Sequence, residues 1–415
     1  MSTQQQFSFE MHSDLDLVAS EVPTQRVIEL VVVPPSAHAA TSRPALNLAL
    51  VIDRSGSMSG DKIDNVRRAA VHVLDLLQEQ DQVAIVAYDD TINLLAPSQH
   101  VTPQARASLK SLIQELMPGN MTNLCGGWLS GCEEVARVAN ATGGQLNRVL
   151  LLTDGLANVG ITDLEEIGLH ASQLLNRGIA TSTFGVGLDF NEHLLEHMAN
   201  QGGGRFYFIS DPVAIQGIFV QEFRELAAVT AQAVEVTLEI PAQVDAKVLG
   251  SWRNEQTGQS LRLWLGDIPS GQRREVYVRL LVPPQSGQAE LAILAQVNAG
   301  GEQGEPLSAS AQVTFKYAPR MQIAAAPVRQ EVMQRYSQVE MADSVTEALK
   351  LERAGQRQEA SQLIGQNLAA AAPYLPQAEQ AQYAQLSERI LKHGLDEKSR
   401  KTSHQQAYTS KRRLD

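Results

Sequence analysis

Apolar runs of strand length alternate with amphipathic segments along the first half of the chain. The run 46–52 (LNLALVI) is typical of a strand at the centre of a parallel sheet, where both faces are covered. Between such runs, apolar residues recur at helical spacing. The predicted strands are 46–52, 82–87, 148–152, 179–186 and 205–209, and the predicted helices are 61–80, 103–117, 124–139, 164–176, 191–200 and 212–229. This alternation predicts a doubly wound α/β domain with a mainly parallel sheet.

After Thr230 the apolar period changes to two. Short alternating segments, separated by clusters of Gly, Ser and Asp, predict a β-sandwich over residues 230–318. Residues 1–40 hold two further strand-like segments, which have no partner of their own. A two-stranded ribbon is marginally stable by itself, so we expect these strands to join the sandwich. The α/β domain, residues 41–229, would then be inserted between sandwich strands.

The C-terminal region has a different composition. Residues 319–395 are rich in Ala, Gln and Glu and predict two or three helices, with turns near 354–355 and 373–376. They would form a cap on the sandwich or, alternatively, a partner surface resembling a tetratricopeptide unit. Residues 396–415 carry six Lys and Arg but three Asp and Glu, and we expect a basic, disordered tail.

Composition limits the possible functions. The 415 residues include 34 Lys and Arg against 46 Asp and Glu, a net charge of −12, which argues against nucleic-acid binding and docking on anionic lipid. Cys125 and Cys132 lie seven apart in one predicted helix, too far for a disulfide, and are expected to be buried apolar residues. With neither a signal peptide nor a membrane span in the sequence, the expected location is the cytoplasm.

The candidate chemistry follows the first buried strand, which runs into Asp53-Arg54-Ser55-Gly56-Ser57-Met58. A carboxylate and two hydroxyls, spaced by two residues on a tight turn, can direct oxygen atoms to one point, and Gly56 lets the loop fold back. Two more loops should reach the same sheet edge, because ligand sites of doubly wound sheets lie at the carboxyl ends of the strands. Thr122 offers a hydroxyl there and Asp154 a second carboxylate. Hard oxygen ligands of this kind suit Mg²⁺.

Several motifs together resemble the von Willebrand factor A-type domain, in its bacterial form. They are LALVIDRSGSM, the Thr122-Asn123 pair before a helix, LLTDGLAN, and the later segment GVGLDFNEHLLEHMANQGGGRFYFISDP. The resemblance covers about residues 45–229, and inter-alpha-inhibitor heavy chains share the general layout of flanking regions. One departure is that Asn120 and Met121 stand where bacterial relatives often have glycines, which concerns the path of that loop.

The resemblance implies an intact metal-ion-dependent adhesion site. Asp53, Ser55 and Ser57 would bind the metal, and Thr122 and Asp154 would complete its shell directly or through water. Mg²⁺ is the expected ion, with Mn²⁺ or Ca²⁺ as alternatives. In this family, an acidic side chain of a partner protein typically fills the open coordination position. The resemblance therefore predicts a non-enzymatic, metal-dependent protein-binding module whose partner presents Asp or Glu.

Two other classes of function stay open. A scaffold or assembly protein would act through the sandwich and the C-terminal helices, and bacterial A-type proteins often work beside AAA+ ATPases of the MoxR type. A magnesium-dependent phosphoryl-transfer enzyme would use Asp53, but Ser55 stands where a second Asp is expected, and the sequence has no phosphate-binding loop motif. Nearby, Asp89-Asp90 is interpreted as a turn, Asp189 as a helix cap, and His193 and His197 as helix-surface residues. The sequence does not indicate an oligomeric state.

Overall fold

The computed structural model describes residues 6–37, 43–139, 145–286 and 290–412. The predicted boundary at residues 40 and 41 lies outside these ranges. The chain forms two compact units, one made of residues 37–233 with 300–305, and the other of 1–36, 234–299 and 306–415. We call them the doubly wound unit and the sheet–helix unit. The sheet–helix unit is assembled from separate chain segments, because residues 37–233 are inserted between its N-terminal strands and its remaining strands.

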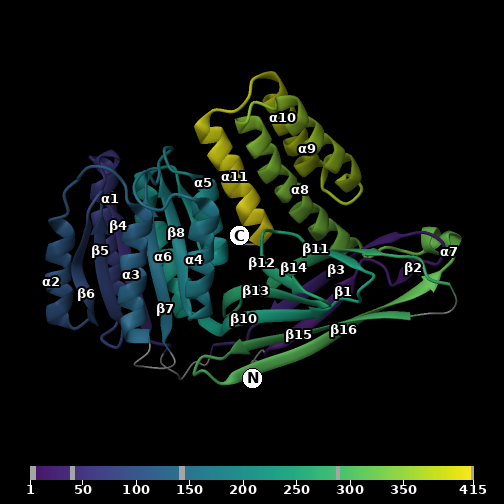
Figure 1. The fold of residues 1–415 in the computed structure, drawn as a ribbon, viewed down its shortest axis with the longest axis horizontal. Helices are drawn as coiled ribbons and strands as arrows, with labels where there is room; N and C mark the ends of the chain where they lie inside the picture. The colour runs from purple at the N-terminus through teal and green to yellow at the C-terminus, as the bar shows by residue number, and fades with distance from the viewer. Residues whose placement is uncertain (1–5, 38–42, 140–144, 287–289, 413–415) are drawn as a thin grey trace. The chain divides into compact units, whose positions relative to one another are not determined.

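The doubly wound unit is a six-stranded sheet with helices on both faces (Figure 1). In sheet order, its strands are β6 (Ile92–His100), β5 (Gln82–Tyr88), β4 (Leu46–Asp53), β7 (Leu146–Thr153), β8 (Ile179–Val186) and β9 (Gly203–Ile209). Its helices are α1 (Asp61–Leu76), α2 (Pro103–Gln114), α3 (Leu124–Ala139), α4 (Leu164–Asn176), α5 (Glu192–Gln201) and α6 (Ile215–Ala227), with single 3-10 turns at η1 (Gly56–Met58) and η2 (Pro212–Ala214). The predicted doubly wound fold is confirmed.

Strand β4 shows why a mostly apolar run predicts a central strand. All eight of its residues are buried. Its alternate side chains Leu46, Leu48, Leu50 and Ile52 enter a core shared with α1, α2 and α6. Val51 faces the opposite way, toward α3. Because helices cover each face, the one polar residue of the run, Asn47, is buried, and its amide donates to the Val135 carbonyl and to Asn147 Oδ1.

Glycines let α3 lie close to the sheet. A Cβ atom added at Gly131 would stand 2.3 Å from Cγ2 of Val51. We expect Gly131→Ala to lower the free energy of unfolding by about 1–3 kcal/mol, because a packed core accommodates an extra methyl group only by straining its neighbours. Gly217→Ala on α6 is the matched control, since nothing lies within 4 Å of its added Cβ atom. Urea unfolding measures both, and equal stabilities would contradict this account of the α3–sheet contact.

Strand β6 was not predicted from the sequence. It pairs antiparallel with β5 at the sheet edge and contains Pro97. Most of its residues are at least partly exposed, so it lacks the apolar run that marks the inner strands. An edge strand tolerates proline because one of its sides makes no ladder hydrogen bonds.

The sheet–helix unit contains two β-sheets. One has the order β1 (Ser8–Ser13), β3 (Thr24–Val33), β14 (Arg274–Val282) and β11 (Asp245–Val248). The other has the order β12 (Arg253–Thr257), β13 (Ser260–Pro269), β10 (Val229–Glu239), β15 (Glu290–Gly300), β16 (Pro306–Ala318) and β2 (Leu17–Ala19). N-terminal strands thus belong to both sheets, and β3 pairs along its length with β14. Strand β15 alternates buried and exposed residues, as the period of two predicts.

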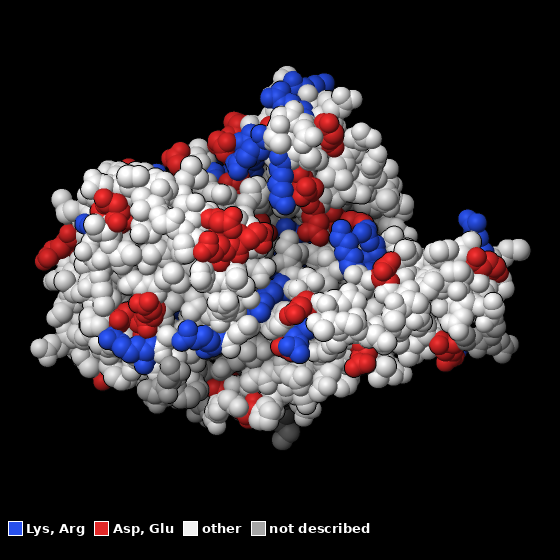
Figure 2. All heavy atoms as spheres, in the orientation of Figure 1, with Lys and Arg blue, Asp and Glu red and all other residues white. Residues whose placement is uncertain are grey.

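The C-terminal helices of this unit are α7 (Arg320–Ala325), α8 (Gln330–Arg353), α9 (Arg357–Ala371), α10 (Gln377–Lys392) and α11 (Glu397–Arg412). The predicted turns at 354–355 and 373–376 separate α8, α9 and α10. In the part of the chain that the structure describes, none of the helices combines the length and apolarity needed to cross a membrane. In Figure 2, Lys and Arg side chains form small separate groups near Asp and Glu, and the face in view presents no continuous basic surface among the described residues.

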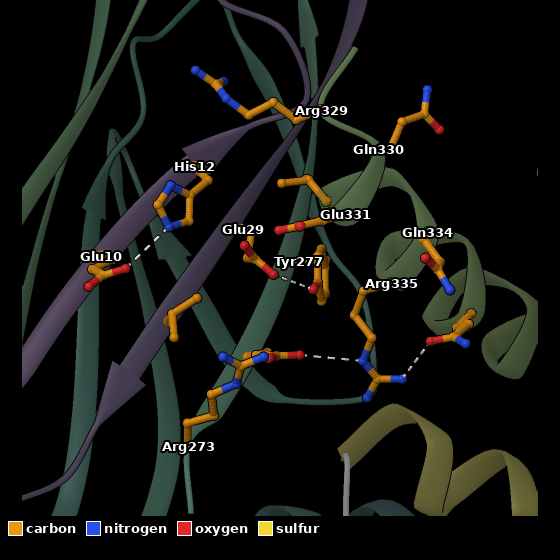
Figure 3. Close-up of a pocket in the computed structure, with 14 residues that line it drawn as sticks. Glu10, His12, Glu29, Arg273, Tyr277, Arg329, Gln330, Glu331, Gln334 and Arg335 are labelled. Atoms are coloured by element: carbon orange, nitrogen blue, oxygen red, sulfur yellow. Dashed lines mark hydrogen bonds and ion pairs between the residues drawn. The ribbon is translucent and has the colours of Figure 1, made fainter. Parts of the chain in front are cut away.

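Helix α8 packs on the four-stranded sheet through apolar and polar contacts. Val332, Tyr336 and Val339 pack with Tyr277 of β14. Beside them lies a hollow of about 740 Å³, into which charged side chains of the sheet and α8 project (Figure 3). The Tyr277 hydroxyl donates to Glu29 at 2.5 Å, and Arg335 of α8 lies 3.4 Å from Glu275. The Arg335–Glu275 ion pair connects the helix to the sheet, whereas the Tyr277–Glu29 hydrogen bond joins two strands of the sheet.

The expectation of a disordered tail at 396–415 is wrong for its described part, since residues 397–412 form α11. Ala407 enters the apolar core of the helices. The guanidinium of Arg400 lies 2.9 Å from the buried carboxylate of Glu352 on α8. Burial by itself would raise the pKa of Glu352, but hydrogen bonds from Arg400 and the Leu395 N–H outweigh burial and lower it. The tail composition was misleading because two of its basic residues pair with acidic residues of α8.

Candidate metal centre

The site lies where the two central strands end. Strands β4 and β7 are neighbours in register, Ile52 opposite Leu152, so the residues that follow them emerge side by side. The Thr153 hydroxyl donates to Asp53 Oδ2 at 2.6 Å. The parallel arrangement thus brings the carboxylates of Asp53 and Asp154 to one sheet edge, although they are about a hundred residues apart in the sequence.

The loop after β4 supplies three of the predicted ligands. Asp53 is fully buried, and its Oδ1 accepts a hydrogen bond of 2.8 Å from the Ser55 N–H. The Oγ atoms of Ser55 and Ser57 lie 3.1 Å apart. Burial raises the pKa of Asp53 to about 6, and hydrogen bonds from Thr153 and Ser55 offset this only in part. The buried carboxylate would therefore be stabilised by a cation.

The other two loops bring Thr122 and Asp154 to the same point. Asp154 is fully buried and accepts a 2.7 Å hydrogen bond from the Ser57 hydroxyl. A Cβ atom at Gly155 would stand 3.4 Å from Thr122 Oγ1 and 3.5 Å from Ser57 Oγ, so both hydroxyls lie beside this glycine. All five predicted ligands are therefore grouped around one small region of the sheet edge.

Backbone hydrogen bonds hold the three loops together. The Gly56 N–H donates to the Asn120 carbonyl at 2.8 Å, and the Gly119 N–H donates to the Arg54 carbonyl at 2.6 Å. The Asn158 side chain accepts from the Thr122 N–H at 2.9 Å. The Asn120 carbonyl closes the loop against Gly56. The loop therefore presents a buried Thr122 by this path.

The donor set favours a hard divalent cation. It consists of two carboxylates and three hydroxyls, with no nitrogen or sulfur. Among the described residues, no group of three or more His, Cys, Asp and Glu could hold a metal ion by itself, so the hydroxyls are essential to any site here. Oxygen-only donors, few enough that water completes the shell, fit Mg²⁺ better than a metal that prefers His or Cys.

Sequence reasoning missed Lys62, in the first turn of α1. Its ammonium forms an ion pair with Asp154 Oδ2 and lies 3.9 Å from Asp189 Oδ2. A lysine is unfavourable at a helix N-terminus, because the helix dipole is positive there. That placement is the only sequence signal that could have drawn attention to Lys62, and Asp154 accounts for it structurally.

We expect Lys62→Met to tighten Mg²⁺ binding. The ammonium occupies one carboxylate oxygen of a predicted ligand and repels a divalent cation, and removing that repulsion should lower the Mg²⁺ dissociation constant on the order of tenfold. Isothermal titration calorimetry measures the change. Lys110→Met is the matched control, because Lys110 pairs with Asp75 on the surface of the same unit. Unchanged or weaker Mg²⁺ binding by Lys62→Met would contradict the competition.

Other residues near the site have structural roles. Asp89 is buried, lies 3.0 Å from the Arg54 guanidinium, and accepts the Asn123 N–H at its carbonyl. It therefore braces two loops of the site, a role that its interpretation as a turn did not include. Asn191, not Asp189, caps α5, by accepting from the N–H groups of the first helical turn. His197 packs against Gly168 of α4.

Comparisons with known proteins give a family model for one part of the chain and similar folds for the whole of it. Residues 47–221 match the family model of the von Willebrand factor type A domain. These residues form a von Willebrand factor type A domain. Over the whole chain, the fold is similar to a von Willebrand factor type A protein from Catenulispora acidiphila, with a TM-score of 0.76, 17% identity and coverage of 99% of this chain and 98% of that one. The ArnB paralog VWA2 from Sulfolobus acidocaldarius has a TM-score of 0.66, 17% identity and 99% coverage of both chains.

Sequence relatives include proteins without a described function. An uncharacterised protein of Synechocystis is 26% identical over 85% of this chain and 84% of its own length. The uncharacterised protein YfbK of Escherichia coli is 32% identical over 48% of this chain, but only 35% of its own length. Human inter-alpha-trypsin inhibitor heavy chain H3 is 28% identical over 42% of this chain and 20% of its own length. The latter two matches thus concern one part of longer proteins, and H3 is named as a chain of an inhibitor.

Proposed function

We propose that this protein is a metal-dependent protein-binding module. Asp53, Ser55, Ser57, Thr122 and Asp154 hold a divalent cation, Mg²⁺ in the first place and Mn²⁺ or Ca²⁺ as alternatives. When bound, the cation offers an open coordination position to a carboxylate. A protein partner supplies that carboxylate from Asp or Glu. The location in the cytoplasm stays a prediction from the sequence.

The observation that carries the proposal is a pair of buried carboxylates with three hydroxyls on three tied loops. Asp53 accepts hydrogen bonds from two neutral groups, the Thr153 hydroxyl and the Ser55 N–H, and burial raises its pKa to about 6. A buried anion without a cationic partner is costly, and a divalent ion would offset that cost. The family match also supports the proposal, because von Willebrand factor type A domains generally mediate protein–protein interactions, often through a metal.

The residues of the site prepare it for this task. The hydrogen bonds between Gly56 and Asn120, and between Thr122 and Asn158, hold the loops in place before a partner arrives. Preformed loops lose little conformational freedom on binding. The chain has a net charge of −12 and would repel an acidic partner, so only a local cation makes this edge attractive to a carboxylate.

The test is partner capture by the immobilised full chain in Mg²⁺, in EDTA, and with Asp53→Ala. We expect proteins that are retained only by the wild-type chain in Mg²⁺ and released by EDTA. Substitution of one exposed Asp or Glu of such a protein should abolish its retention. Asp189→Ala is the matched control, because Asp189 is exposed near the site but is not a predicted ligand.

Retention that persists in EDTA and in Asp53→Ala, by a chain shown to be folded, would contradict the proposal. It would favour the scaffold alternative, in which the sheet–helix unit makes the contacts. Deletion of that unit's C-terminal helices would then abolish retention, whereas loss of the metal would not.

A further inference from the structure

Two loops of the candidate metal centre, and the neighbouring loop after β8, carry large apolar side chains that the core does not bury. Met121, directly before Thr122, is 51% exposed, and Leu156, two residues after Asp154, is 55% exposed. Leu188, in the loop after β8, is 37% exposed. We call these three residues the apolar rim. Single exposed apolar residues are ordinary on a protein surface, but a group around a functional site indicates an interaction surface.

Each rim residue is adjacent in the chain to a residue that lies in or next to the site. Met121 precedes Thr122 in the chain, and Leu156 follows Gly155, whose added Cβ atom would stand 3.4 Å from Thr122 Oγ1. Leu188 follows Gly187, which packs against the Lys62 side chain that pairs with Asp154. The rim therefore comes from the surroundings of both Thr122 and Asp154, and not from one loop alone.

The rim is also held in place. Thr122 accepts the Asn158 N–H at its carbonyl, at 3.2 Å, and donates its own N–H to the Asn158 side chain. This reciprocal pair joins the loop of Met121 to the loop of Leu156. A hydrophobic surface on braced loops contributes to affinity because little freedom is lost when a partner covers it.

We infer that the apolar rim selects the partner: the protein segment that binds here presents an Asp or Glu flanked within two residues by apolar side chains. This inference rests on the proposed function and adds the chemistry of the neighbouring residues. The cation alone would discriminate little between partner proteins, since Asp and Glu occur on every protein surface. In an extended segment successive residues are about 3.3 Å apart, so residues next to the acid reach the side chains around the site.

The test uses synthetic peptides of eleven residues with one central Glu in a Gly-Ser background, and a second set with Leu on both sides of the Glu. In Mg²⁺, we expect the full chain to bind the Leu-flanked set about tenfold more tightly, the factor that corresponds to burial of roughly half a leucine side chain. The double variant Met121→Gln, Leu156→Gln should lose this preference but keep its Mg²⁺ affinity in calorimetry. Leu169→Gln is the matched control, because Leu169 is 57% exposed on α4.

The outcomes separate the two proposals. Mg²⁺-dependent binding of both peptide sets with equal affinity would contradict selection by the apolar rim, but it would still support the proposed metal-dependent module. A preference that survives in the double variant, or that Leu169→Gln removes equally, would also contradict selection by the rim. Failure of every peptide to bind while Mg²⁺ itself binds, or binding that EDTA does not reduce, would count against both. Thermal unfolding of each variant shows that it is folded.

Discussion

Asp53→Ala is expected to abolish Mg²⁺ binding, raising the dissociation constant at least about 100-fold, because the loss of one charged ligand to a divalent ion exceeds the roughly 2.7 kcal/mol that this factor represents. Asp53 is the fully buried carboxylate at the end of β4, and Ser55 and Thr153 orient both of its oxygens. Neither a water molecule nor another described side chain of the loop could replace its charge at that point.

Two measurements check this expectation. Calorimetry with Mg²⁺ gives the affinity directly, and thermal unfolding gives an independent result. A ligand that binds only the folded state stabilises it by about 2.7 kcal/mol at a hundred times its dissociation constant, so Mg²⁺ should raise the Tm of the wild type and leave that of Asp53→Ala unchanged. Asp189→Ala should behave as the wild type. Equal Mg²⁺ affinity in wild type and Asp53→Ala would show that the ion binds elsewhere or not at all.

Arg400→Met should release α11 from the other C-terminal helices. Arg400 and Glu352 are both buried, and Arg400 also donates to the Leu395 carbonyl at 2.9 Å. Removing the guanidinium leaves the Glu352 carboxylate buried without its cation, a change that typically costs about 3–5 kcal/mol. Of the six residues that α11 buries, only Ala407 and Tyr408 are hydrophobic, so apolar burial offsets little of this loss.

Hydrogen exchange, followed by mass spectrometry, measures the release of α11, which should lose most of its amide protection. Arg353→Met is the matched control, since Arg353 pairs with Glu397 at 3.2 Å on the exposed surface. Exposed pairs contribute about 0–1 kcal/mol, so protection should change little there. Protection of α11 in Arg400→Met that equals the wild type would mean that other contacts hold the helix.

The inner strands and most helices of the doubly wound unit could be predicted because their signals are local. The run Leu46–Ile52 is mostly apolar because both faces of a central strand are covered, and its one polar residue, Asn47, is buried with hydrogen-bond partners. Predicted and observed bounds agree for α3, α4 and β8. The edge strand β6 was not predicted because an exposed strand lacks the apolar run that marks the inner strands. Helix α11 was not predicted because buried ion pairs take the place of buried apolar residues.

Sequence by itself determined which oxygen-bearing side chains follow the central strands. Because parallel strands end at a common edge, that was enough to group Asp53, Ser55, Ser57, Thr122 and Asp154 as one candidate site. Only the tertiary structure decided which residues far apart in the chain contact one another: Lys62 with Asp154, Glu352 with Arg400, and β3 with β14. Local sequence patterns predict strands and helices because these elements depend on residues that are neighbours in the sequence. An ion pair between distant segments produces no periodic pattern in the sequence of either segment. It forms only once the folded backbone has brought the two side chains together.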